Sequence, residues 1–181
     1  MVEYQDLISF WFDEKNKPLW FNSTKEFDNE LRNKFEDCLL AGKNGELKSW
    51  ENNPLGLLAL VILFDQIPLN IYRNTLAAFE TEKKSRRVAK QCIDKNWHGS
   101  LDKEQQSFLY MPFMHSELMS DQQYALTLFE EAGLQENVKF ANHHRNIIEK
   151  FGRFPHRNKV LGRESTQAEL DYLSSKEAFL G

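Results

Sequence analysis

A short basic segment near the end of the chain is the strongest candidate for a functional site. Residues 151–163, FGRFPHRNKVLGR, contain three arginines, one lysine and one histidine but no acid, although the whole chain has a net charge of -4. Gly152, Pro155 and Gly162 prevent a single helix or strand from running through this segment. Arginine binds carboxylate or phosphate through two parallel hydrogen bonds. The segment is therefore either an anion-binding pocket or a loop whose arginines bind acidic helix ends.

Two histidines could supply acid–base chemistry. His144 is spaced with Phe140, Ile147 and Phe151 so that all four lie on one stripe of a helix, which we expect to face the core. A buried imidazole needs a hydrogen-bond partner, and a carboxylate partner would raise its pKa. His144 is thus either a core histidine or the acid–base group of a site. His156, within the basic segment, is the second candidate for that role.

A second segment, YMPFMHSELMSDQQ at residues 110–123, supplies carboxylates. Pro112, followed by polar residues, predicts a helix start, and Glu117 and Asp121 are spaced to lie on one face of that helix. Either both acids stabilise the positive first turns of the helix, or they face the basic segment across a cleft and orient a histidine there. Metal-ligand spacings such as HxxxH and CxxC are missing, so we expect no metal site. We assign catalytic roles to Glu117, His144 and His156.

The third segment, FDQIPLNIYRNT at residues 64–75, follows a very apolar stretch. Asp65 therefore lies at the end of a buried helix, where a carboxylate must find a partner. We expect that partner to be Arg73 or an arginine of the basic segment. The predicted ligand-binding residues come from all three segments: Asp65, Gln66, Arg73, His115, Asp121, Gln122, Arg153, Arg157, Asn158 and Arg163.

The elements that must position these residues are all predicted to be helices. Residues 55–64, LGLLALVILF, are apolar on every side and predict a central buried helix that begins at Pro54 and ends at Pro68. Ser23-x-x-Glu26 and Thr166-x-x-Glu169 are expected capping boxes, Gly42 is an expected helix end, and residues 135–151 form a helix ended by Gly152. Sustained period-two alternation is absent, so we expect no significant sheet.

Length and composition predict one all-α domain over residues 1–181, arranged as an irregular antiparallel array of about 8–10 helices. The longest apolar run is far below the roughly 18 residues of a membrane span, and the acidic start has no signal-peptide pattern. We therefore expect a monomeric cytoplasmic protein that does not bind membranes. Cys38 and Cys92 are far apart and are expected to be reduced structural thiols.

These segments together resemble the bacterial family called domain of unknown function 924. The similarity extends from about Ser9 to Leu180 and is most specific at FGRFPHRN. It implies a tetratricopeptide-like helical fold and carries no established reaction or cofactor. One position departs from the family pattern, since Leu69 stands where members usually have an arginine. If the family arginine binds a ligand, this chain has lost a ligand contact. If that arginine pairs with the carboxylate at the position of Asp65, Asp65 has lost its partner here.

Two functions fit these observations. The first is a polar pocket of arginine, histidine and carboxylate groups that binds a small anionic ligand, either phosphorylated or not, with or without catalysis. The second is a tetratricopeptide-like module that binds a peptide or a partner protein. Nucleic acid is not an expected partner, because a pI near 5.8 is far from a basic footprint. No cofactor is expected.

Overall fold

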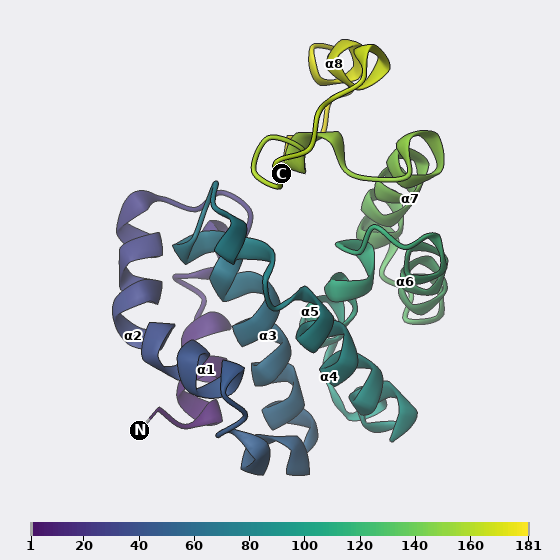
Figure 1. Cartoon of the computed structure of the whole chain (residues 1–181). Helices are drawn as coiled ribbons and strands as arrows, with labels where there is room; N and C mark the ends of the chain where they lie inside the picture. Colours follow the sequence, from purple (N-terminus) through teal and green to yellow (C-terminus); the bar gives the residue numbers. More distant parts are fainter. Residues whose placement is uncertain (1, 181) are drawn as a thin grey trace. The chain divides into compact units, whose positions relative to one another are not determined.

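The computed structural model describes residues 2–180 and confirms the all-α class (Figure 1). No strand occurs among these residues. The α-helices are α1 (Tyr4–Trp11), α2 (Lys25–Lys43), α3 (Pro54–Ile71), α4 (Glu82–Asp94), α5 (Lys103–Met114), α6 (Met119–Glu131), α7 (Gln135–Phe151) and α8 (Gln167–Leu173). Short 3-10 turns lie between them: η1 (Lys17–Leu19), η2 (Lys48–Asn52), η3 (Leu76–Phe79), η4 (Trp97–Ser100) and η5 (Pro155–Arg157). The tetratricopeptide-like arrangement stays a prediction.

The chain forms two compact units. The first contains residues 1–73 and 77–112, and the second contains residues 74–76 and 113–181. The chain passes from the first unit to the second within α5. The single domain over residues 1–181 stays a prediction.

The first unit is built around α3. This helix packs against α1, α2, α4 and η2, and its residues from Gly56 to Pro68 are all buried. Such burial follows from its sequence, because a helix that is apolar on all sides has no face suited to water. Asn53 caps its start through a hydrogen bond from the Gly56 N–H to the Asn53 side chain (2.9 Å), and Pro54 occupies the first helical position as predicted.

Pro68 does not end α3, contrary to the prediction. The helix continues to Ile71 with this proline inside it. A proline has no N–H, so the carbonyl of Phe64 loses its helical donor. The hydroxyl of Thr81, buried on the neighbouring segment, donates to that carbonyl instead, at 2.6 Å. A tertiary hydrogen bond thus compensates for the proline.

Three other predicted boundaries are also wrong. Thr24 rather than Ser23 caps α2, because the Thr24 side chain accepts the hydrogen bond from Phe27 N–H. Gly42 lies inside α2, where a side chain would come within 2.9 Å of the Phe64 ring. Pro112 lies inside α5 rather than before a helix, and the next helix begins only at Met119.

The second unit contains α6, α7, the basic segment and α8. Helices α6 and α7 pack side by side (Figure 1), and α7 spans residues 135–151 as predicted. Gly152 ends it with φ +71°, a conformation that glycine adopts without steric cost. The capping box at Thr166 and Glu169 is also confirmed and begins α8.

Helix α3 is the one described helix that is long and apolar enough to cross a membrane by length and composition. In the structure 83% of its 18-residue apolar window is buried against other parts of the protein. The core helix of a folded domain gives the same composition signal, so the packing around α3 explains its hydropathy without a membrane.

Gly56 provides a test of the packing between α3 and η2. A Cβ at this position would lie 2.1 Å from the Trp50 carbonyl oxygen, a backbone atom that cannot rotate away. We expect Gly56→Ala to lower the free energy of unfolding by about 2 kcal/mol, the usual cost of overpacking. Gly99→Ala is the matched control, because a Cβ there meets nothing within 4 Å. Urea denaturation measures both, and equal stability of the two variants would contradict the tight contact.

Candidate functional site

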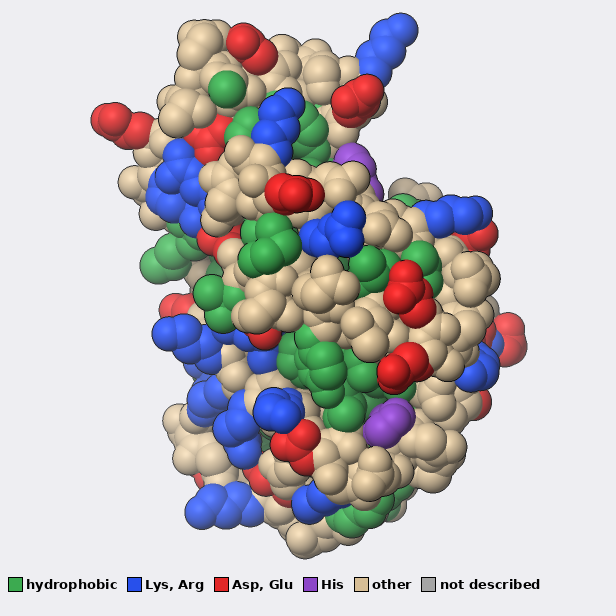
Figure 2. All heavy atoms as spheres, turned by 90° about the vertical axis from the view of Figure 1, so that its right-hand side faces the viewer, with side chains coloured by type: hydrophobic (Ala, Val, Ile, Leu, Met, Phe, Trp, Pro, Cys, Tyr) green, Lys and Arg blue, Asp and Glu red, His purple; other side chains and the backbone are tan. Residues whose placement is uncertain are grey.

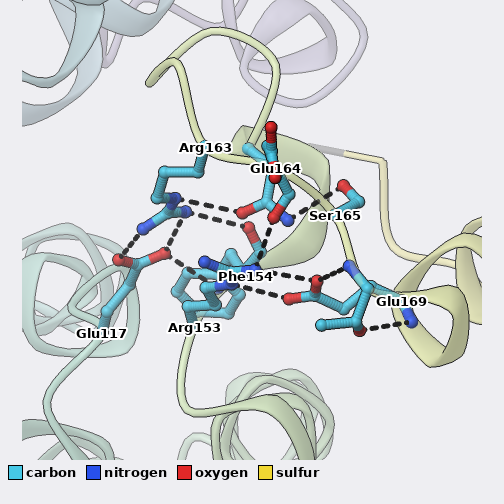
Figure 3. A network of polar contacts seen from close by, with 9 residues as sticks. Glu117, Arg153, Phe154, Arg163, Glu164, Ser165 and Glu169 are labelled. Carbon is cyan, nitrogen blue, oxygen red and sulfur yellow. Dashed lines mark hydrogen bonds and ion pairs between the residues drawn. The ribbon is translucent and has the colours of Figure 1, made fainter.

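A bidentate ion pair joins the basic segment to Glu117, two residues before the start of α6 (Figure 3). The Nη1 and Nη2 atoms of Arg163 donate to the two carboxylate oxygens of Glu117 at 2.7 and 2.9 Å. The Nε atom of Arg163 donates to the Asn158 side chain at 3.0 Å. Both charged side chains are about one quarter exposed. This geometry fixes the guanidinium in one orientation.

Glu117 also holds the backbone of the segment. Its Oε1 atom accepts a hydrogen bond from the Phe154 N–H at 2.8 Å. Burial opposes the charge on Glu117, but the hydrogen bonds from Arg163 and Phe154 outweigh it and lower the pKa of this carboxyl. The carboxylate is therefore ionised near neutral pH and accepts three hydrogen bonds from the basic segment.

A second bidentate pair holds the other end of the segment. Arg153 donates through Nε and Nη2 to Glu169 at 2.6 and 2.9 Å, and Nη2 also donates to the Glu164 carbonyl (Figure 3). Glu169 is 2% exposed and also accepts from the Thr166 N–H at 2.7 Å. The guanidinium of Arg153 is the main cause that lowers the pKa of Glu169 to about 2.

Between the two ion pairs, the segment is held by its own side chains. Phe154 is fully buried with Ile147 and Ile148 of α7. The Asn158 side chain donates to the Ser165 hydroxyl at 3.0 Å and accepts from Arg163. Buried packing and hydrogen bonds, both within the segment and to Glu117 and Glu169, therefore give it an ordered structure rather than that of a solvated loop.

Aromatic and histidine rings cluster beside this network. The His144 ring lies 5.5 Å from Phe154 and 4.5 Å from Phe179, and the His156 ring lies 5.0 Å from Phe179, all measured between ring centroids. The His115 ring is 6.4 Å from His144. The unit thus brings together three histidines that are up to 41 residues apart in the sequence.

The buried His144 and the half-buried His156 are both neutral at pH 7. Burial is the main cause that lowers the pKa of His144 to about 3 and that of His156 to about 4. The second cause that lowers the pKa of His144 is the nearby His115. The second cause that lowers the pKa of His156 is the positive charge of Arg157. The guanidinium carbon of Arg157 lies 4.7 Å from the centre of the Phe154 ring, which places a positive charge beside this cluster.

The hydrogen bond of His144 defines its tautomer. Its Nδ1 atom lies 2.8 Å from the carbonyl oxygen of Phe140, and a carbonyl can only accept. The proton is therefore on Nδ1, and Nε2 of the neutral ring carries a lone pair. His144 is buried as expected, whereas Phe140, predicted for the same core-facing stripe, is 58% exposed. The apolar stripe of α7 is thus narrower than its sequence spacing indicated.

Other polar side chains between positions 110 and 123 stabilise the start of α6. The Ser116 hydroxyl donates to Asp121 at 2.6 Å and accepts from the Leu118 N–H at 3.2 Å. The fully buried Gln122 side chain donates to the carbonyls of Met114 and Ser116, both at 2.6 Å. Gln122 therefore binds the local backbone, and Asp121 binds the Ser116 side chain.

Asp65, Gln66 and Arg73 belong to the first unit. Gln66 donates to Asp65 at 2.7 Å, and both side chains are buried. Arg73 hydrogen-bonds Asp28 and Asn70, so the expected pairing of Arg73 with Asp65 is not the one formed. Leu69, at the position that departs from the family pattern, is partly buried.

Two residues of this site were not predicted. Glu169 was recognised only as a capping residue, and its pairing with Arg153 depends on where α8 lies. Phe179, which packs on His143, His144 and His156, is near the end of the chain in a segment without periodic signal. Among residues 2–180, no group of three or more histidine, cysteine, aspartate or glutamate side chains could hold a metal ion.

Comparison with known proteins supports the family resemblance that the sequence motifs indicated. Residues 7–177 match the family described as "Bacterial protein of unknown function (DUF924)". The chain belongs to this family. The solved structure of a protein of unknown function from Agrobacterium tumefaciens is similar to it, with 34% sequence identity and a TM-score of 0.90 over 94% of this chain and 96% of that one. A comparison with curated proteins found no match.

The Glu117–Arg163 pair is testable in this DUF924 protein. We expect Arg163→Ala to lower the free energy of unfolding by about 2–3 kcal/mol, because it leaves a half-buried carboxylate with only the Phe154 N–H as donor. In a double-mutant cycle, Glu117→Ala with Arg163→Ala should cost less than the sum of the single variants. Lys139→Ala is the control, because its partner Glu136 is 76% exposed. Additive losses would show that the pair does not couple.

The two neutral histidines predict a dependence of stability on pH. Because their folded pKa values lie below the ordinary value of 6.5, the unfolded chain binds more protons as the pH falls through 6.5, and folding is weakened. Between pH 7 and pH 5 we expect the free energy of unfolding to fall by about 2 kcal/mol for each histidine. The contributions of Glu117 and Glu169 to the free energy of unfolding are lost only below about pH 4.5.

Denaturation at pH 7, 6 and 5 measures this effect, and NMR of the imidazole signals measures the pKa values directly. The variant His144→Gln should show a shallower slope than the parent protein. A flat stability profile from pH 7 to pH 5, or an imidazole pKa near 6.5 for both residues, would contradict the prediction.

Proposed function

We propose that this protein binds a small anionic ligand in the second unit, at His156 and Arg157 beside the two ion pairs. The observation that carries the proposal is the His156 Nδ1 atom, which is buried and has no hydrogen-bond partner among residues 2–180. A buried polar atom without a partner costs free energy. Such atoms are retained where a ligand or water completes the hydrogen bond.

The charge around His156 supports an anion rather than a cation. The carboxylates of Glu117 and Glu169 are each bound by an arginine through two hydrogen bonds. Arg157, which is 6% exposed, lowers the pKa of both His144 and His156 through its charge. A group that depresses a neighbouring histidine pKa creates the positive potential that attracts an anion.

In this proposal the predicted residues have different tasks. Arg153, Arg163 and Asn158 position the segment rather than clamp the ligand. Arg157 and His156 are the ligand-binding groups. His156 is also the strongest candidate for an acid–base role, because Glu117 is held ionised by its donors.

Phosphate titration followed by NMR tests the proposal. An anion at His156 favours the charged imidazole, so the pKa of His156 should rise in the presence of phosphate. The variant His156→Ala should weaken phosphate binding tenfold or more, equivalent to about 1.4 kcal/mol. His98→Ala in the first unit is the matched control and should bind phosphate as the parent does. If phosphate, acetate and sulfate all leave the His156 signals unchanged, the proposal is wrong.

A peptide-binding module is the second candidate. Leu118 and Met119, which directly follow Glu117, are 57% and 41% exposed. Neighbouring exposed apolar side chains are common in surfaces that bind other proteins. A peptide bound there would change the amide NMR signals of residues 117–121, whereas an anion at His156 would change those of the basic segment.

A further inference from the structure

A groove in the first unit forms a separate candidate binding site. It has a volume of about 530 Å³ and is bounded by the end of α2, by η2, and by α3 and α4. Small-molecule sites commonly have volumes of about 300–1,000 Å³. None of the residues in the second unit lines it.

The side chains along this groove are strongly basic. Four positive side chains line it and only one carboxylate, that of Glu51: the positive residues are Lys48, Lys84, Arg87 and Lys95. The chain as a whole has a net charge of -4, and acidic, basic and apolar side chains are interspersed on the face drawn in Figure 2. A local surplus of three positive charges in an acidic protein concentrates positive potential in this groove.

Lys84 is held by a hydrogen bond to the Lys43 carbonyl, whereas the other three positive groups have weak partners, or none, that an anion can replace or join. Lys95 donates to a backbone carbonyl of Glu51 at 3.4 Å and lies 4.3 Å from the centre of the Trp97 ring. Arg87 donates to the Glu51 carboxylate at 3.2 Å and to the Gln91 side chain at 3.4 Å. The Lys48 ammonium is exposed and makes no hydrogen bond or ion pair with the residues that the structure describes. Exposed pairs of this kind contribute little to stability, so rearranging them costs little.

The floor of the groove is apolar. It is formed by Leu47, Leu60 and the Phe64 ring, above which Lys84 lies 5.9 Å from the ring centre. Gly42 and Gly45 form part of the wall and have no side chain to fill the space. A Cβ on Gly42 would come within 2.9 Å of the Phe64 ring, so glycine lets α2 approach this part of the floor closely.

We infer that this groove binds a small organic phosphate. The phosphate would lie among the Lys48, Arg87 and Lys95 head groups, where arginine and lysine donate to phosphate oxygens. The organic part would lie against the apolar floor and the glycine wall. The apolar floor favours an organic phosphate over inorganic phosphate, and the volume suits a molecule of mononucleotide size better than an extended polymer.

NMR titration of the whole isotope-labelled protein tests this inference with adenosine 5′-monophosphate, glucose 6-phosphate and inorganic phosphate. We expect an organic phosphate to cause saturable shifts in the amide signals of residues 42–52 and 84–95, and to bind more tightly than inorganic phosphate. These signals are distinct from those of residues 153–163, so this site and the proposed anion site of the second unit succeed or fail independently.

Paired variants separate a specific site from general charge attraction. The variant with Lys48→Gln and Arg87→Gln should weaken binding tenfold or more. The control with Lys83→Gln and Arg86→Gln removes the same charge from α4 outside the groove, and it should bind within about twofold of the parent. Equal weakening by both variants would overturn the inference, as would the absence of saturable shifts with either organic phosphate.

Discussion

The order of the second unit depends on the carboxylate of Glu117. This single group accepts hydrogen bonds from the Phe154 backbone and from both Nη atoms of Arg163, so it joins the start of α6 to two points of an otherwise irregular segment. A charged acceptor with several donors contributes more than the same number of neutral hydrogen bonds. Because Phe154 is then fixed in the core beside α7, the rest of the segment has little freedom.

The positive charge of the basic segment is largely used for structure. Arg153 and Arg163 each neutralise one glutamate, and these pairs replace the regular backbone hydrogen bonding that glycine and proline prevent. The groups beside these ion pairs give the segment its distinctive chemistry. Two neutral histidines lie there beside the Arg157 guanidinium, and their lowered pKa values record both the burial and the positive charge.

The first unit depends on one side-chain hydrogen bond and on close packing at glycines. Its core helix tolerates an internal proline because Thr81 supplies the missing donor, and it closely approaches its neighbours through Gly42 and Gly56. The same close packing leaves a groove beside α4 whose rim is basic and whose floor is apolar. Glycine therefore contributes both to the density of this unit and to the shape of its surface.

The sequence by itself determined the helical class, the central apolar helix, the end of α7 at Gly152 and the polar groups of the basic segment, because each depends on local periodicity, capping or residue type. Only the tertiary structure decided which groups meet. The pairing of Arg153 with Glu169 and the continuation of α3 through Pro68 depend on partners 16 and 17 residues from the atoms they bind. Sequence spacing does not encode such contacts, because the packing of separate helices brings the partners together.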